Sequence, residues 1–488
     1  MKIAFITTEV YPYAKVGGLG DVSAALPLAL FNLKHDVNIF MPFYGSIDKK
    51  KFSIRRYGHW KVFKIKVGED EFEVELFRNK LNKKVNVFFI RNDKLFGRNG
   101  IYTDENGNSF KDSHIRDIFF SRAVVEVIKT LNIKYDIIHL NDSHTALVAP
   151  YLKLIYKDEE VFENIKVVLT IHNLGAAYQG IHEAIEIERA GFSYDLHYLG
   201  GPLEFYGKFN FLKAGIYYSD SVTTVSPKYA QEIKTPQFGE GLDGVLREFD
   251  YKLKGILNGI DVDEWNPQTD KLILKNYNLD TFKKGKKINK KEVLKRFGLK
   301  DVEKPLIAMI SRLTTQKGFD LLEQAVEELS KINFNLAILG TGEKNYEMIL
   351  SSLSEKYDFM SVILKYDNSL AHLMEAGADF FLMPSKYEPC GLNQMYSLRY
   401  GTIPIVRAVG GLEDSVVAYP CENADGFKIG EHSLISLLNT LKEAIGLYYN
   451  NFSEIENMIK NGMKKDLSWN KSAEEYIKLY VGLKKEQY

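Results

Sequence analysis

A glycine-rich loop follows the first apolar segment and has the composition of an anion site. It reads Lys15-Val16-Gly17-Gly18-Leu19. A glycine-rich turn between a strand and a helix exposes backbone N–H groups, and the helix N-terminus adds partial positive charge. The spacing is neither that of a dinucleotide fingerprint nor that of a Walker loop, which disfavours NAD and P-loop chemistry. The loop therefore suits a phosphate; a tight strand–helix turn without a ligand is the alternative.

Two cations, Arg312 and Lys317, follow a later strand-like segment, Leu306–Ser311. A strand tip and a turn can bring both side chains over one site. There the planar guanidinium contacts an oxyanion through two N–H groups, and the ammonium acts as a point charge. The pair suits a diphosphate, and two surface cations beside a helix start are the alternative.

Glu388 follows a further apolar segment, in Ser385-Lys386-Tyr387-Glu388-Pro389-Cys390-Gly391-Leu392. The backbone amides of Cys390, Gly391 and Leu392, at a predicted helix start, could meet an anion. The carboxylate could meet sugar hydroxyls or a developing oxocarbenium charge. A glutamate that only complements the helix dipole is the alternative, and the Pro-Cys-Gly turn argues against it.

Histidines also lie at predicted strand ends: His139, His144 and His172. Asp142 and His144 could chelate a metal, but no further ligand cluster has metal-site spacing. A nucleophilic triad is disfavoured as well, because Ser143 lacks a nucleophile elbow and Cys390 has no base nearby in sequence.

The composition is that of a globular protein with more than one core. Of 488 residues, 45% are hydrophobic and 26% are charged, which predicts two substantial domains. Basic and acidic residues both number 64, so the formal net charge is zero and nucleic acid is not an implied partner. Two cysteines are too few for a disulfide framework. We expect a cytoplasmic protein, with neither a signal peptide nor an apolar run of the roughly 20 residues that span a membrane.

Short apolar segments rich in β-formers alternate with helical ones, which predicts parallel α/β sheets. The strands predicted for a first sheet are Lys2–Val10, Asp36–Pro42, Val85–Arg91, Tyr135–Asn141, Lys166–His172 and Ser221–Ser226. Those predicted for a second sheet are Leu306–Arg312, Asn335–Gly340, Ser361–Tyr366, Asp379–Pro384 and Thr402–Arg407. Within the second series, one apolar stripe predicts a helix: Leu321, Leu322, Ala325, Val326 and Leu329.

The segment between the two series is rich in turn residues, from Gly255 to Asp261. A run of lysines follows it: Lys283, Lys284, Lys286, Lys287, Lys290 and Lys291. This run favours a solvated helical face over a polyanion site. We predict two doubly wound, Rossmann-like α/β domains facing a cleft, because such sheets bind ligands outside the carboxyl ends of their strands.

Taken together, these motifs resemble those of the bacterial and plant glycogen and starch synthases. The matching pieces occur in the family's order: Lys15–Leu19, Tyr102–Asp104, Thr170–Leu174, Leu212–Gly215, Val225–Pro227, Leu257–Asp261, Ser311–Gly318, Pro384–Leu392 and Tyr400–Thr402. The resemblance implies a GT-B architecture, with an N-terminal domain over 1–258 and a C-terminal domain over 259–465. A C-terminal helix within 466–488 is expected to return to the N-terminal domain.

The resemblance also implies an activity. The expected enzyme transfers glucose from ADP-glucose, or UDP-glucose, to the 4-hydroxyl at the non-reducing end of an α-1,4-glucan. The anomeric configuration is retained, and no metal or other cofactor is required, since Arg312 and Lys317 match the family's diphosphate cations. Lys15 and Gly18 match its loop at the diphosphate and acceptor side.

Other functional residues of the family map onto this chain one by one. Glu388 matches the essential carboxylate, and His144 matches the histidine near the donor glucose. Asp112 matches an acidic cleft residue, and Asn258 matches the hinge asparagine near the transferred sugar. Tyr366 stands where the family stacks a nucleobase, a contact that suits any base because it uses the ring face.

Two segments depart from the family pattern. Asn141-Asp142-Ser143-His144 replaces the usual His-Asp-Trp-His, and Leu174–Gly180 carries two extra residues near the expected acceptor site.

Two other functions remain as alternatives. Another GT-B transferase is disfavoured by the ordered motif set, and a non-catalytic glucan-binding protein would need neither the two cations nor Glu388.

Overall fold

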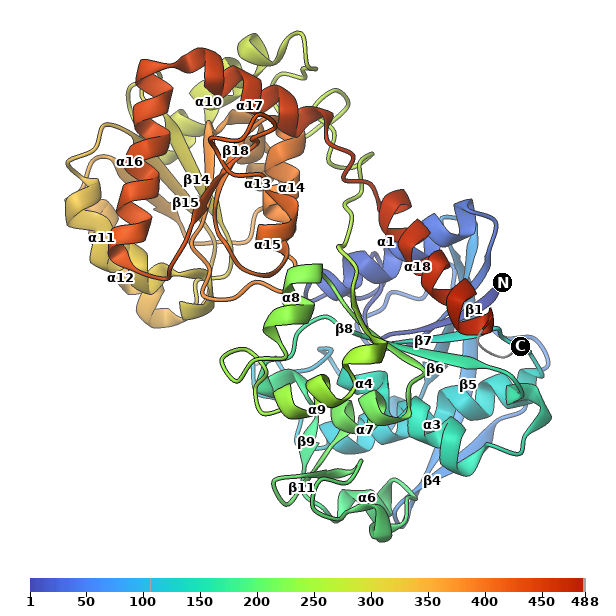
Figure 1. Cartoon of the computed structure of the whole chain (residues 1–488). Helices are drawn as coiled ribbons and strands as arrows, with labels where there is room; N and C mark the ends of the chain where they lie inside the picture. The colour runs from blue at the N-terminus through green and yellow to red at the C-terminus, as the bar shows by residue number, and fades with distance from the viewer. Residues whose placement is uncertain (106, 486–488) are drawn as a thin grey trace. The chain divides into compact units, whose positions relative to one another are not determined.

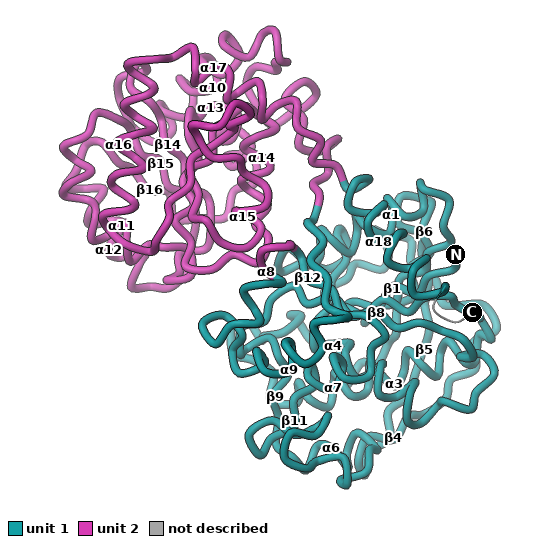
Figure 2. Tube along the Cα trace, viewed as in Figure 1, with its two compact units in different colours: residues 1–225, 230–258, 469–488 teal, residues 226–229, 259–468 magenta. Residues whose placement is uncertain are grey.

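The computed structural model describes residues 1–105 and 107–485, and the chain divides into two compact units. The first unit comprises residues 1–225 and 230–258 and the chain from Trp469 onward. The second comprises residues 226–229 and 259–468. The chain therefore enters the second unit briefly at residues 226–229, passes to it again after Asn258 and returns after Ser468 (Figure 2).

The described part of the first unit is built on a ten-stranded sheet, whose main path runs β13-β12-β8-β7-β1-β2-β6-β5-β3. Its parallel strands are β1 (Lys2–Ile6), β2 (Asp36–Pro42), β6 (Val85–Arg91), β7 (Ile137–Asn141), β8 (Lys166–Ile171), β12 (Ser221–Thr224) and β13 (Leu253–Gly255). β1 is buried from Ile3 onward, as expected of a parallel strand covered on both faces. Each strand predicted for the first sheet is confirmed.

An antiparallel extension at one edge of this sheet was not predicted. It consists of β3 (Arg55–Arg56), β4 (Phe63–Val67) and β5 (Asp70–Leu81). A separate small sheet, ordered β10-β11-β9, contains β9 (Ile181–His182), β10 (Glu204–Phe205) and β11 (Lys208–Asn210).

The helices of the first unit precede or follow these strands (Figure 1). They include α1 (Gly18–Asn32), α2 (Asp93–Phe96), α3 (Ser113–Leu131), α4 (Ser143–Ala146), α5 (Val148–Pro150), α6 (Glu186–Arg189), α7 (Phe211–Tyr218), α9 (Asp243–Glu248) and α18 (Trp469–Lys485). The helix α8 (Pro227–Glu232) begins in residues assigned to the second unit and ends in the first. No helix in the described part of the chain has the length and apolar character that crossing a bilayer requires.

The C-terminal helix α18 packs against α1 in the first unit. Tyr476 and Tyr480 are fully buried and share one helical face. The Tyr480 hydroxyl forms a 2.7 Å hydrogen bond with Nδ1 of His139, and Ser472 Oγ donates to the carbonyl of Leu257 at 2.6 Å. His139 is thus a buried core residue.

In the described part of the second unit, six parallel strands form one sheet in the order β16-β15-β14-β17-β18-β19. They are β14 (Leu306–Ile310), β15 (Asn335–Leu339), β16 (Met360–Ile363), β17 (Phe380–Met383), β18 (Ile403–Arg407) and β19 (Phe427–Ile429). The helices are α10 (Phe282–Phe297), α11 (Phe319–Leu329), α12 (Lys344–Lys356), α13 (Asn368–Gly377), α14 (Asn393–Tyr400), α15 (Gly410–Ser415), α16 (Leu434–Asn450) and α17 (Phe452–Lys464).

Helices cover both faces of this sheet. Ile307 and Met309 of β14 belong to a core shared with α11, α16 and α17, whereas Leu306 and Ala308 belong to a core shared with α10 and α13. This alternation follows from the two-residue period of a strand. The predicted doubly wound architecture is confirmed, as is the predicted apolar stripe of α11, which is buried throughout.

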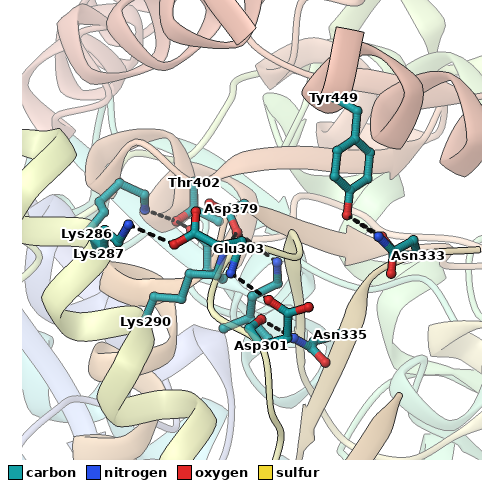
Figure 3. Close-up of polar contacts among 12 residues, drawn as sticks. Lys286, Lys287, Lys290, Asp301, Glu303, Asn333, Asn335, Asp379, Thr402 and Tyr449 are labelled. Carbon is teal, nitrogen blue, oxygen red and sulfur yellow. Dashed lines mark hydrogen bonds and ion pairs between the residues drawn. The ribbon is translucent and has the colours of Figure 1, made fainter. Parts of the chain in front are cut away.

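The lysine run lies on α10, and the prediction of a solvated face is wrong for Lys286 and Lys290, which are 7% and 4% exposed. Lys286 Nζ donates to Thr402 Oγ1 at 2.7 Å and to the carbonyl of Tyr400, the last residue of α14, at 3.2 Å. Lys290 forms a 2.7 Å ion pair with Asp379 (Figure 3). Because α10 packs against α13, one of its faces is buried. The two ammonium groups on that face bind helix-end carbonyls and a carboxylate instead of water.

Candidate active site

The residues predicted to bind a nucleotide follow strands of the second sheet. Arg312 follows β14, Tyr366 follows β16 and Glu388 follows β17. Because the six strands are parallel, their carboxyl ends lie at one edge of the sheet, where doubly wound folds bind ligands.

Glu388 and Lys317 are in direct contact. Glu388 is 6% exposed, and its Oε2 accepts hydrogen bonds from Lys317 Nζ at 2.5 Å and from Ser385 Oγ at 3.2 Å. Lys317 ends a short 3₁₀ turn, and Gly318 continues the chain with φ 79°. A Cβ on Gly318 would lie 2.3 Å from the carbonyl oxygen of Pro384, so only glycine lets the two loops approach this closely.

Arg312 is exposed, and its guanidinium has no hydrogen-bond or ion-pair partner within residues 1–105 and 107–485. Tyr366 is 83% exposed, and it lies between Lys365 and Asp367, which form a 2.7 Å ion pair. The guanidinium and the phenol ring are thus both accessible from solvent, as contacts to a diphosphate and a base require.

The loop after Glu388 is held by residues that sequence reasoning did not single out. Gly411 N donates to the carbonyl oxygen of Glu388 at 3.2 Å, and a Cβ on Gly410 would lie 2.0 Å from that oxygen. Arg407, the last residue of β18, donates to the carbonyl of Ser385 at 3.3 Å. Ser226 Oγ donates to the carbonyl of Pro389 at 2.8 Å. Of these residues, only Ser226 belonged to a matched motif.

The predicted anion-contacting segment of this loop leads into α14. Cys390 is buried, Gly391 has φ 69° and Leu392 is the N-cap of the helix. Gln394 Nε2 donates to the carbonyl oxygens of Cys390 and Gly391, at 3.1 and 3.0 Å. The segment therefore has a defined backbone conformation at the start of a helix.

In the first unit, the glycine loop leads from β1 into α1, whose first residue is Gly18. Lys15 Nζ forms a 2.7 Å ion pair with Asp21 in the first turn of the helix. The amides of Val16 and Gly17 donate to Glu9 Oε2 at 2.6 and 2.9 Å. These two amides therefore hold a carboxylate of the protein itself. The remaining candidates for binding a substrate are Lys15 and the helix start at Gly18.

His144 lies on α4 and is held by two side chains. Its Nδ1 donates to Asp117 Oδ2 at 2.9 Å, and its ring stacks on that of Tyr102, with the centroids 4.8 Å apart and the planes at 19°. Asp117 was not predicted from the sequence, and Tyr102 was included only as part of a motif. Burial by itself lowers the pKa of His144, but the charge and hydrogen bond of Asp117 outweigh it and raise the pKa above 6.5.

Asp112 and Asn258 have different surroundings. Asp112 is the residue before α3, and its carboxylate accepts from Arg98 Nη2 at 2.9 and 3.0 Å. Asn258 is 6% exposed and is the last residue of the first unit before the crossing. Its Oδ1 is buried and lacks a hydrogen-bond partner in the described part of the chain, so it can accept a hydroxyl.

The two departing segments are anchored within the first unit. Asn141 donates through Nδ2 to the carbonyl of Ile6 at 2.8 Å, and its Oδ1 is hydrogen-bonded to His172 Nε2 at 2.9 Å. In the longer loop, Gln179 is fully buried and donates to the carbonyl of Leu174 at 3.0 Å. The exposed Ala176 and Ala177 form a short 3₁₀ turn. The loop therefore keeps its ends fixed and projects its middle into solvent.

Among the described residues, no further side chain joins Asp142 and His144 to complete a metal site. Asp142 Oδ1 accepts from the amide of His172 at 2.7 Å. Among the described residues, no group of three or more His, Cys, Asp or Glu side chains could hold a metal ion.

The contact with Asp117 should appear as a raised pKa when the imidazole of His144 is titrated. We expect NMR of the imidazole to show a midpoint above pH 6.5, and Asp117→Asn to lower it. Because the folded pKa exceeds the unfolded one, the pair stabilises the fold fully below the unfolded pKa. This contribution is lost as the pH rises through the raised folded value. Asp112→Asn is the matched control, since Asp112 pairs with Arg98. A wild-type midpoint below 6.5 would contradict the assignment.

Comparison with known proteins gives a consistent set of matches. Residues 2–248 match a family model described as the starch synthase catalytic domain, and residues 290–465 match glycosyl transferases group 1. A glycogen synthase of Fervidobacterium nodosum is 46% identical, with 98% of each chain covered. A glycogen synthase of Pseudothermotoga lettingae is 43% identical, with 100% of each covered.

Two solved structures also match this chain. The catalytic domain of starch synthase IV from Arabidopsis thaliana, bound to ADP and acarbose, matches with a TM-score of 0.89 and 31% identity over 99% of each chain. A sucrose-phosphate synthase from Thermosynechococcus elongatus shares the fold, with a TM-score of 0.60 and 17% identity over 99% of this chain and 98% of that one.

Proposed function

The chain belongs to the glycogen and starch synthase family of glycosyltransferases, and we propose that it extends an α-1,4-glucan from ADP-glucose with retention of configuration. One arrangement in the second unit carries this proposal. An exposed Arg312, which has no partner among the described residues, and a Lys317–Glu388 ion pair follow neighbouring strands, β14 and β17, of one parallel sheet. This combination of two cations and a carboxylate suits a nucleoside diphosphate leaving group and an adjoining sugar.

Arg312 and Lys317 would stabilise the charge that develops on the diphosphate as the glycosidic bond breaks. The contact of Lys317 with Glu388 does not prevent this, because an ammonium has three N–H donors and can serve a phosphate oxygen at the same time. Tyr366 would stack on the nucleobase. Its ring face accepts adenine or uracil, and the preference for ADP-glucose is supported by the ADP in the starch synthase IV structure.

Glu388 would orient sugar hydroxyls and stabilise an oxocarbenium-like centre on the face from which the diphosphate leaves. Its ion pair with Lys317 makes it a weak nucleophile, since a carboxylate that accepts a charge-assisted hydrogen bond gives up electron density. A trapped glycosyl-Glu388 adduct, detected by mass spectrometry, would overturn this assignment.

In the first unit, His144 would position the transferred glucose by hydrogen bonding, since Asp117 and Tyr102 already fix its ring. Asn258 Oδ1 would accept a hydroxyl of the same sugar. Lys15 and Gly18 would serve the diphosphate and the acceptor glucan. The chain has only two cysteines, which supports a reducing, cytoplasmic location. No membrane or nucleic acid is assigned as a partner.

One assay tests the proposed function. The protein is incubated with glycogen and either ADP-glucose or UDP-glucose, and release of the nucleoside diphosphate is followed. We expect release that depends on glycogen and is faster with ADP-glucose. Reactions without glycogen measure hydrolysis and serve as the control. The absence of release from both donors would refute the proposal.

Metal independence is a separate expectation. Because Arg312 and Lys317 would neutralise the leaving diphosphate, we expect the rate in excess EDTA to equal that without chelator. A loss of activity that added Mg²⁺ restores would show that a divalent ion shares the charge with Arg312 and Lys317.

A further inference from the structure

A buried carboxylate connects the glycine loop to the aromatic face that supports His144. Glu9 is 3% exposed. Its Oε2 accepts the amides of Val16 and Gly17, at 2.6 and 2.9 Å, while its Oε1 accepts the hydroxyl of Tyr102 at 2.8 Å. One side chain therefore bonds to two segments that are far apart in sequence. A buried carboxylate with its acceptor sites satisfied in this way is a rigid connection.

Tyr102 carries the connection on to the histidine. Its hydroxyl is fixed by Glu9 and by Thr8 Oγ1 at 2.8 Å, and its ring lies against the imidazole of His144. Burial and the nearby Glu9 charge raise the pKa of Tyr102 well above 10, so the hydroxyl remains a donor. Asp117 holds the edge of the same imidazole. Tyr102 and Asp117 thus restrain the ring in two different directions.

We propose that Glu9 and Tyr102 are positioning residues that hold the glycine loop, Lys15–Gly18, in a fixed relation to the imidazole of His144. The assignment of this loop and this histidine to substrate rests on the proposed function. The hydrogen bonds themselves do not. A displacement of about 1 Å in a group that orients the substrate can cost about a hundredfold in rate, so a rigid connection at this place has a direct kinetic value.

Three variants separate this role from a general contribution to stability. Tyr102→Phe keeps the ring on His144 but removes the bond to Glu9. Glu9→Gln keeps the shape of the side chain but removes the charge that both loop amides contact. The third variant combines the two. Tyr44→Phe is the matched control, because Tyr44 is a buried tyrosine of the same unit that donates to the carbonyl of Thr8 at 3.0 Å without bonding to Glu9 or His144.

We expect each single variant to lower kcat by about tenfold or more, with the KM for the donor changed by less than about twofold. The double variant should be no slower than the slower single variant, because both changes break the same connection. Tyr44→Phe should retain the wild-type kcat. Wild-type kcat in Tyr102→Phe, or additive losses in the double variant, would overturn the proposal.

Hydrogen exchange provides a readout that does not depend on activity. In Tyr102→Phe, where the loop itself is unchanged, the amides of Val16 and Gly17 should exchange about tenfold faster than in the wild type. In Glu9→Gln, the imidazole proton resonances of His144 should move as the Tyr102 ring shifts above them. Unchanged exchange and unchanged resonances would also overturn the proposal. If the wild type transferred no glucose, the proposed function would fail while these two measurements still decided the coupling.

Discussion

Replacing Glu388 by glutamine should lower kcat by about a hundredfold to a thousandfold, the range expected when one preorganised electrostatic contact to a transition state is lost. The substitution preserves volume and can still accept from Ser385 Oγ, so the loop between Ser385 and Pro389 should keep its conformation. What it removes is the negative charge that Lys317 contacts at 2.5 Å. Initial rates with saturating ADP-glucose and glycogen measure the effect.

The control for Glu388→Gln is Glu303→Gln, since Glu303 is an exposed residue of the same unit that pairs with Lys287 at 2.9 Å. An exposed pair of this kind contributes little to stability, so this variant should have the wild-type kcat. Glu388→Asp retains the charge with a shorter reach and should fall between the wild type and Glu388→Gln. A Glu388→Gln enzyme within about threefold of the wild type would remove Glu388 from the transition state.

His144→Ala should lower kcat by about a hundredfold while the Kd for ADP stays unchanged. His144 lies in the first unit, whereas the groups assigned to the nucleotide, Arg312 and Tyr366, lie in the second. Removing the imidazole should leave those contacts intact and take away only the group that we propose orients the transferred glucose. Steady-state kinetics give kcat, and isothermal titration with ADP gives Kd.

His59→Ala is the control for His144→Ala, because His59 is an exposed histidine of the same unit. It should change neither kcat nor the Kd for ADP. If His144→Ala weakened ADP binding by tenfold or more with kcat unchanged, His144 would act on the nucleotide and its assignment to the sugar would be wrong.

Five strands of the second sheet, β14 to β18, and its ligand edge could be predicted from the sequence because their signals are local, whereas β19 was not predicted. Each strand is a short apolar segment, and Arg312 and Glu388 stand directly after such segments. In a parallel sheet, a position after a strand is also a position at the ligand edge. The antiparallel extension was missed even though Phe72, Val74 and Leu76 of β5 are buried and alternate with the more accessible Glu73 and Glu75. The predicted strands were continuous apolar runs, which are typical of buried parallel strands, and this half-exposed segment is not such a run.

Burial of charged groups could not be predicted, because it depends on what packs against them. Lys286 and Lys290 look the same in the sequence as the exposed Lys284 and Lys287. Only the packing of α10 supplies the carbonyl of Tyr400 and the carboxylate of Asp379 as partners for the two buried ammonium groups. A lysine without such partners could not be buried at acceptable cost.

The sequence by itself determined the family, the two α/β sheets and the identity of the cations and carboxylate that follow the strands, because these depend on local pattern and order. The tertiary structure alone decided how the side chains are connected. In the fold, Lys317 forms an ion pair with Glu388, and the amides of Val16 and Gly17 donate to Glu9. The imidazole of His144 bonds to Asp117 and stacks on Tyr102. Such contacts join residues distant in sequence, and hydrogen bonds act only over about 3 Å, so the packed fold decides which partners meet.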